Sequence, residues 1–229
     1  MSTMSESLIR VSVLANLDFR WDALIRSRLE GIGDDEYLWE PVAGCLSVHP
    51  DAAGGYTLEP VGPTEFPLGN IAWRMAHLAS SLSNHPVAAV AFGAAWPKPE
   101  LAAPAGTAAV AVSRLDSAYS HWHATVASLS DADLARRLGS AAGQYAESSV
   151  LDLILHIQAE ALQRGADLCL LRDLYWHLRR RQRAPRMRPS ETASSVPKYP
   201  VVQQGGTFAA HSPHIVVLSG RNFRHTNRN

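Results

Sequence analysis

Residues 151–175 read LDLILHIQAEALQRGADLCLLRDLY, and this stretch decides the fold. Apolar residues fill most of its helical circumference, which is typical of a helix packed inside a helical protein. Its polar residues form one row within an arc of about 120°, at about 100° per residue. The row comprises Asp152, His156, Glu160, Gln163, Arg164 and Asp167. The segment therefore predicts a long helix whose single polar stripe faces the interior of a bundle.

Three further segments carry the same helical rhythm. Residues 7–31 place apolar side chains at three- and four-residue steps and end at Gly31. Residues 68–82 contain a candidate helix cap, Asn70, and residues 108–129 form the third segment. Loops rich in Pro and Gly separate these segments, and none of them shows sustained period-two alternation. The expected fold class is all-α, an up-down four-helix bundle in which each helix buries one stripe.

The composition indicates one globular domain followed by a segment of different character. The chain has 229 residues, of which 46% are hydrophobic and 18% are charged. Residues 1–175 hold 11 Lys and Arg against 20 Asp and Glu, a net charge of −9, whereas residues 176–229 hold 10 against 1, a net charge of +9. We predict a bundle domain over residues 7–176 and a largely disordered, Arg-rich, low-complexity tail over residues 177–229.

Several functional classes are disfavoured by what the chain lacks. Its two cysteines, Cys45 and Cys169, form no CxxC pair, so neither a disulfide framework nor a cysteine zinc site is expected. No window resembles a signal peptide or an apolar span of about 20 residues, which predicts a cytoplasmic protein without a membrane partner. The basic tail has no aromatic platform or groove-reading helix, so we do not expect nucleic-acid binding. An extension of the chain translated in a shifted reading frame would have the same composition, so both origins of residues 177–229 stay open.

The polar row has two interpretations on pattern alone. In the first, Glu160 and Arg164 form an ordinary i,i+4 ion pair on a solvated face, and His156 is a hydrogen-bonded histidine. In the second, the row is half of a metal site, because metal sites in helical bundles are built from side chains on facing helices. A ligand from a second helix would then complete it.

Three phrases together resemble the DinB-like (DinB/YfiT) superfamily of four-helix proteins, particularly an actinobacterial branch. They are LEGIGDDEYLWEPVAGCLSVHP at residues 29–50, IAWRMAHLA at residues 71–79, and LILHIQAEALQRGADLCLLRDLY at residues 153–175. The resemblance covers most of residues 8–175 with the phrases in the right order. It implies a divalent metal, zinc or nickel, bound between the second and fourth helices.

The resemblance also implies the ligands. The ligand of the second helix falls on His77, and a glutamate of the last helix falls on Glu160. The family's remaining histidine falls on Arg164, which cannot bind a metal because its guanidinium stays protonated. Three outcomes stay open: His156 joins His77 and Glu160, Gln163 offers a weak carbonyl ligand, or the site is empty with Arg164 against Glu160. The predicted metal ligands are His77, His156 and Glu160.

The activity implied by the resemblance is that of a metal-dependent, thiol-dependent transferase or isomerase, similar to the mycothiol-dependent maleylpyruvate isomerases. A small-molecule thiol such as mycothiol, or a thiol conjugate, would be the co-substrate, and a homodimer is expected. The alternative is a non-catalytic DinB-like bundle without metal that acts as a binding or stress-related protein.

The remaining histidines and one cysteine receive no functional role. His121 and His123 are two residues apart and point to different helix faces. His49 and His85 lie beside prolines in predicted loops, and no partner spacing singles them out. Cys45 is expected to be a small buried hydrophobic residue.

Overall fold

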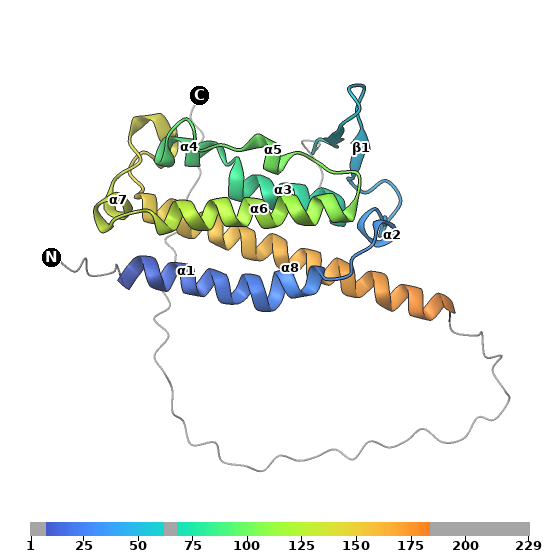
Figure 1. Cartoon of the computed structure of the whole chain (residues 1–229). Coiled ribbons are helices and arrows are strands. Elements are labelled where there is room, and N and C mark those ends of the chain that lie inside the picture. Colours follow the sequence, from blue (N-terminus) through green and yellow to red (C-terminus); the bar gives the residue numbers. More distant parts are fainter. Residues whose placement is uncertain (1–7, 62–67, 184–229) are drawn as a thin grey trace, which may run out of the picture. The chain divides into compact units, whose positions relative to one another are not determined.

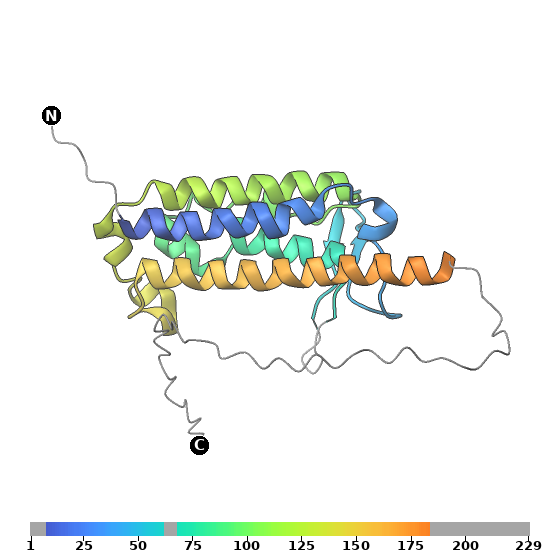
Figure 2. The same ribbon diagram turned by 90° about the horizontal axis from the view of Figure 1, so that it is seen from below.

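The computed structural model of this protein describes residues 8–61 and 68–183. Within them, four long helical segments lie side by side, as Figures 1 and 2 show. They are α1 (Leu8–Arg20) with its continuations η1 (Trp21–Arg26) and η2 (Ser27–Leu29), α3 (Ile71–Ser83), α6 (Ala108–Ala127) and α8 (Val150–Arg183). Buried apolar residues from all four meet in one core. The all-α four-helix bundle is confirmed.

The direction of the helices departs from strict up-down alternation at one connection. Helices α1 and α8 run in one direction, and α3 and α6 run in the other (Figure 1). The connection from α3 to α6 travels back along the bundle and contains α4 (Pro86–Phe92) and α5 (Pro99–Ala102). Because a short loop joins antiparallel neighbours, this long return is what allows α3 and α6 to run parallel.

The first helix buries a stripe of residues four positions apart. Leu17, Trp21, Ile25 and Leu29 are all nearly inaccessible to solvent. The Trp21 ring stacks on Tyr119 of α6 with the ring centroids 4.1 Å apart. This four-residue spacing places the stripe on one face, so the predicted amphipathic helix docks through that face.

Side-chain caps set the starts of the helices that carry the site. The Asn70 side chain accepts a hydrogen bond from the Trp73 amide at 3.0 Å and donates one to Ser47 at 2.7 Å. The predicted cap at Asn70 is therefore confirmed. At the start of α8, the Ser149 amide and hydroxyl both donate to Asp152, each at 2.8 Å, and the Asp152 amide donates back to the Ser149 hydroxyl. This reciprocal capping box orients the first turn of α8.

Short elements occupy the connections. The helix α2 (Asp34–Tyr37) follows the first helix, and α7 (Asp131–Ala135) and η3 (Ser140–Tyr145) precede α8. The antiparallel strands β1 (Val48–Pro50) and β2 (Tyr56–Leu58), together with α4 and α5, lie in segments that were predicted as loops. Three-residue strands and one- or two-turn helices are too short to show a periodic pattern in the sequence.

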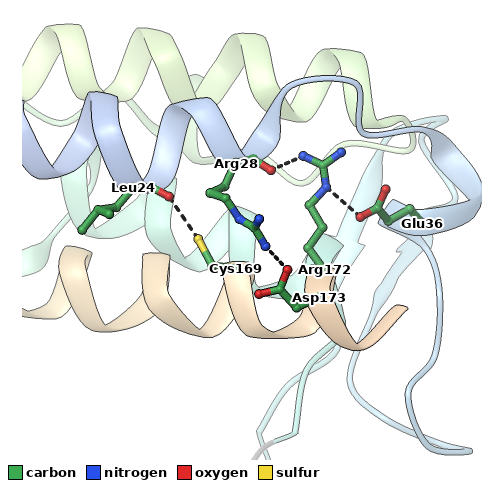
Figure 3. A network of polar contacts seen from close by, with 6 residues as sticks. All are labelled: Leu24, Arg28, Glu36, Cys169, Arg172 and Asp173. Atoms are coloured by element: carbon green, nitrogen blue, oxygen red, sulfur yellow. Dashed lines mark hydrogen bonds and ion pairs between the residues drawn. The ribbon is translucent and has the colours of Figure 1, made fainter. Parts of the chain in front are cut away.

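A group of ion pairs joins α8 to the end of the first helix and to α2 (Figure 3). The Arg172 guanidinium donates to Glu36 at 2.8 Å and also to the backbone carbonyl of Arg28. Arg28 in turn pairs with Asp173. The Glu36 side chain is only 3% exposed, whereas those of Arg28 and Asp173 are 43% and 65% exposed. One buried and one exposed ion pair therefore lie next to each other.

Both cysteines are free thiols in the described residues. Cys45 is buried, as predicted. The Cys169 thiol donates to the Leu24 carbonyl at 3.2 Å (Figure 3). Burial raises the pKa of both thiols, which disfavours the reactive thiolate form.

The last helix is longer than predicted. It continues to Arg183, so residues 177–183, assigned to the tail, are helical instead. The rest of the predicted tail, residues 184–229, lies outside the described residues. None of the helices in the described part of the chain has the length and apolar character that a membrane span requires.

Candidate metal centre

The polar row of α8 lies along a partly exposed edge of the bundle. Atom Nε2 of His156 is 3.5 Å from Oε1 of Glu160, and Nη2 of Arg164 is 3.5 Å from the other oxygen, Oε2. The side chain of His156 is 54% exposed, and those of Glu160 and Arg164 are about 30% exposed. The row is thus neither a fully solvated face nor a closed interior site, and a small molecule could reach it.

His85 completes a group of three with His156 and Glu160. Each of these residues offers one potential ligand atom, and the three atoms lie within 4.8 Å of one another. His85 precedes α4, whose first residue is Pro86. Among the residues that the structure describes, the buried Nδ1 atom of His85 has no hydrogen-bond partner. Burial lowers the pKa of this imidazole, an effect that Glu160 opposes, so the neutral, lone-pair-bearing form is favoured.

The register between α3 and α8 explains why His85 reaches this place. Arg74 pairs with Asp167 at 2.5 Å, and the Ser81 hydroxyl is 3.4 Å from Oε2 of Glu160. In this antiparallel pair each advance along α3 corresponds to an equal retreat along α8, so the end of α3 at Ser83 lies near the turn of α8 that carries His156. The extended backbone at His85 then brings its ring centroid to 6.3 Å from that of His156. The sequence carries one signal for this arrangement: His85 follows Ser81 by four residues, as His156 precedes Glu160 by four. This equal spacing is informative only after one contact between the two helices, such as that of Ser81 with Glu160, is known.

His77 lies one turn before Ser81 and is not part of the group of three. Its ring packs against Trp73 with the centroids 3.8 Å apart. Burial lowers its pKa, and the charges of Arg164 and Arg74 lower it further. Of the predicted ligands His77, His156 and Glu160, the structure brings the last two together and places His85 beside them. The two guanidinium groups near His77 disfavour a divalent cation there.

Contacts from two of the three arrangements left open by the sequence occur together, although His77 is not among the residues that meet. His156 lies beside Glu160, and Arg164 contacts the same carboxylate from the other side. Gln163 is exposed. Glu160 therefore lies between His156, which could bind a metal together with it, and Arg164, whose positive charge would compete with that metal for the carboxylate.

The group of three lies on the wall of a pocket of about 450 Å³. The pocket is formed where the start of α8 meets the start of α4 and the segment around η3. Its lining residues are His85, Pro86, Val87, Leu138, Tyr145, Ser148, Asp152, Leu153, His156 and Glu160. Potential ligands, apolar walls and an opening to solvent therefore occur together, which is typical of a small-molecule site.

These features define a class of protein: a four-helix bundle with a potential metal centre at a pocket between its last helix and the segment that follows the second long helix. A family model for the DinB superfamily matches residues 16–167, and the chain belongs to this superfamily, which includes metal-binding members. No curated protein and no solved structure matches the chain. The matched range contains the whole group of three, so the site is built within the family domain.

Proposed function

We propose that this protein is a metal-dependent enzyme acting on a small-molecule thiol or thiol conjugate, as a transferase or isomerase of the mycothiol-using type. Zinc or nickel is held in this proposal by His85, His156 and Glu160. The observation that carries the proposal is the convergence of these three side chains on the wall of a pocket large enough for a substrate.

The residues present fit such a metal. Two imidazole nitrogens and one carboxylate oxygen form a donor set that suits zinc and nickel and leaves a coordination position for a substrate. The buried Nδ1 of His85 lacks a partner, and a buried polar atom without a partner is costly. A metal bound through Nδ1 of His85 would give this atom a partner and so offset the cost.

The metal, when bound, would acidify a thiol so that the nucleophilic thiolate exists at neutral pH. The residues of the chain position the reacting groups. The Ser81 hydroxyl lies within hydrogen-bond distance of both Glu160, at 3.4 Å, and the His77 carbonyl, at 3.2 Å, and so restricts the orientation of the carboxylate. The buried side chains of Leu138 and Leu153 exclude water from one side of the pocket.

The test is the metal content of full-length protein purified without an affinity tag and supplemented with zinc or nickel. We expect about one equivalent of metal per chain, and in His85→Gln and in His156→Gln a loss of affinity of at least about 10- to 100-fold, the loss that removing a residue behind a ligand already causes. The His49→Gln variant is the matched control, because His49 also pairs with a glutamate, Glu59, at 3.2 Å but belongs to no group of three within residues 8–61 and 68–183. Less than about a tenth of an equivalent in the parent protein contradicts the proposal.

The variant His77→Gln distinguishes this site from the ligand set predicted by the family pattern. We expect it to retain metal, since His77 lies outside the group of three. Thiol binding is then followed on the cobalt-loaded protein by the sulfur-to-cobalt absorption band, which appears only if the sulfur reaches the metal. If the metal is bound but this band does not appear, the proposed metal binding stands and the proposed thiol chemistry is contradicted.

The contact between Arg164 and Glu160 favours a second candidate function, a metal-free bundle that acts as a binding protein. In that case the guanidinium, 3.5 Å from the carboxylate, takes the place of the metal's charge. The two candidates differ in one measurement: the metal-free bundle binds no metal in the parent protein and gains metal binding when Arg164 is replaced by histidine.

A further inference from the structure

The pocket beside the group of three has a charge pattern of its own. Of the described residues, those that line it include two carboxylates, Asp152 and Glu160, and no lysine or arginine. Two arginines carry charge close to this lining: Arg164 pairs with Glu160 itself, and Arg137, which bonds to the backbone and side chain of Glu147, also acts electrostatically on Asp152. Asp152 still has no basic partner at ion-pair distance among the described residues.

Asp152 lines the pocket eight residues before Glu160 on α8. Its Oδ2 atom accepts both hydrogen bonds from Ser149, which leaves Oδ1 for another donor. These two hydrogen bonds lower the pKa of Asp152, so the carboxylate is ionised at neutral pH. Asp152 and Glu160 lie about 12 Å apart along the axis of α8, because each residue rises about 1.5 Å.

The remaining walls are apolar. Pro86 and Val87 line one side of the pocket, and Leu138, Tyr145 and Leu153 line the rest together with the polar residues. A ligand that fills the pocket therefore has an apolar body, one end near the group of three, and another end near Asp152, which forms no salt bridge among the described residues although the charge of Arg137 acts on it.

Resting on the function proposed above, we infer that the pocket takes a substrate with an apolar body that carries an ammonium group at the Asp152 end, and that it discriminates against carboxylates. An ammonium about 4 Å from the Asp152 carboxylate gains affinity even near the protein surface, whereas a carboxylate there is repelled. The substrate is thus an amine-bearing small molecule rather than an organic acid.

The experiment uses three probes of matched size: 4-phenylbutylamine, 4-phenylbutan-1-ol and 4-phenylbutyrate. Their binding to metal-free full-length protein is measured by calorimetry at neutral pH, which prevents the amine from coordinating a metal. Because Asp152 is exposed, we expect the amine to bind about three- to fivefold more tightly than the alcohol, and the acid more weakly than either. High salt should reduce the advantage of the amine but not the affinity of the alcohol.

Substitution Asp152→Asn keeps an acceptor oxygen for the helix cap and removes the charge. We expect it to abolish the advantage of the amine and to leave the alcohol affinity unchanged. Its matched control is Asp133→Asn, because Asp133 forms the same kind of capping box with Ser130 on α7 and does not line the pocket. This control should keep the preference for the amine.

The inference is overturned if the acid binds as tightly as the amine, if none of the three probes binds, or if Asp152→Asn keeps the preference. If Asp152→Asn unfolds, the salt dependence in the parent protein decides instead. Metal content is measured on the same preparations. Metal binding without a preference for the amine overturns only this inference, whereas a preference for the amine without metal binding overturns only the proposed function.

Discussion

Glu160 has a charged or ionisable neighbour on each side, His156 one turn before it and Arg164 one turn after it. The positive charge of Arg164 opposes a divalent cation at the same carboxylate. We therefore expect Arg164→Gln to raise the metal affinity about tenfold, or about 1.4 kcal/mol, because it removes a cation close to the site. Competition with a chromogenic chelator measures the change.

The control for this prediction is Arg26→Gln. Arg26 pairs with Asp116 at 2.8 Å and does not line the pocket of the metal site. It should leave the metal affinity unchanged. An equal affinity in Arg164→Gln and in the parent protein would mean that the guanidinium does not compete with the metal.

His77 makes the stability of the protein sensitive to acid. Its pKa is lowered by burial and by the charges of Arg164 and Arg74, so below a pH of about 6.5 the unfolded chain takes up a proton that the folded protein does not. The free energy of unfolding is expected to fall as the pH drops from 7 towards 5, a window that starts at the pKa of an unperturbed histidine of about 6.5. His77→Gln should weaken this decrease, as urea unfolding at several pH values can show.

The exposed His49 serves as the comparison for this measurement, since its side chain is 54% accessible and lies on the β1 strand. If the pH dependence is the same in His77→Gln, His49→Gln and the parent protein, the burial of His77 is not its source. His85 has a pKa lowered in the same direction and should account for part of the decrease that persists in His77→Gln.

At the scale of elements, the attachment of α8 to the first helix and α2 depends on one buried ion pair (Figure 3). Arg172 and Glu36 have side chains that are 12% and 3% exposed, so removing one partner leaves a buried charge without compensation. We expect Arg172→Met to lower the free energy of unfolding by about 3 to 5 kcal/mol. Urea unfolding monitored by circular dichroism measures the loss.

The neighbouring pair of Arg28 and Asp173 provides the matched control within the same junction. Because both side chains are largely exposed, Asp173→Asn should cost less than about 1 kcal/mol. Similar losses in Arg172→Met and Asp173→Asn would contradict the assignment of the junction's stability to the buried pair.

At the scale of the whole molecule, the core lies well within the described residues. Their buried apolar side chains fall between Leu17 and Tyr175. A chain that ends after Arg183 should therefore unfold within about 2 °C of the full-length protein and bind the same amount of metal. Scanning calorimetry and elemental analysis test this, and a large fall in the unfolding temperature would mean that residues 184–229 contribute to stability.

The path of the chain between α3 and α6 also determines where the candidate site lies. The return connection of residues 84–107 begins at the end of α3, where His85 and α4 face the first turns of α8. Had a short loop led directly from α3 into an antiparallel helix, there would be no α4 to form the wall of the pocket. The departure from strict up-down alternation and the candidate site therefore share one structural cause.

The amino-acid sequence by itself determined the four long helices, the cap at Asn70 and the neighbourhood of His156, Glu160 and Arg164. These features depend on spacings of three and four residues, and such local contacts follow from the geometry of a single helix. For the same reason the sequence could place Glu160 between His156 and Arg164 before any tertiary contact was known.

Only the tertiary structure decided that His85 joins this group, that His77 stays outside it, and that a pocket opens beside Asp152. Each of these facts depends on the register of two antiparallel helices and on the path of a long connection. Register is set by side-chain packing summed over both helix faces. A shift by one turn would exchange His85 for Ser81 opposite His156, and no local pattern in the sequence records that choice.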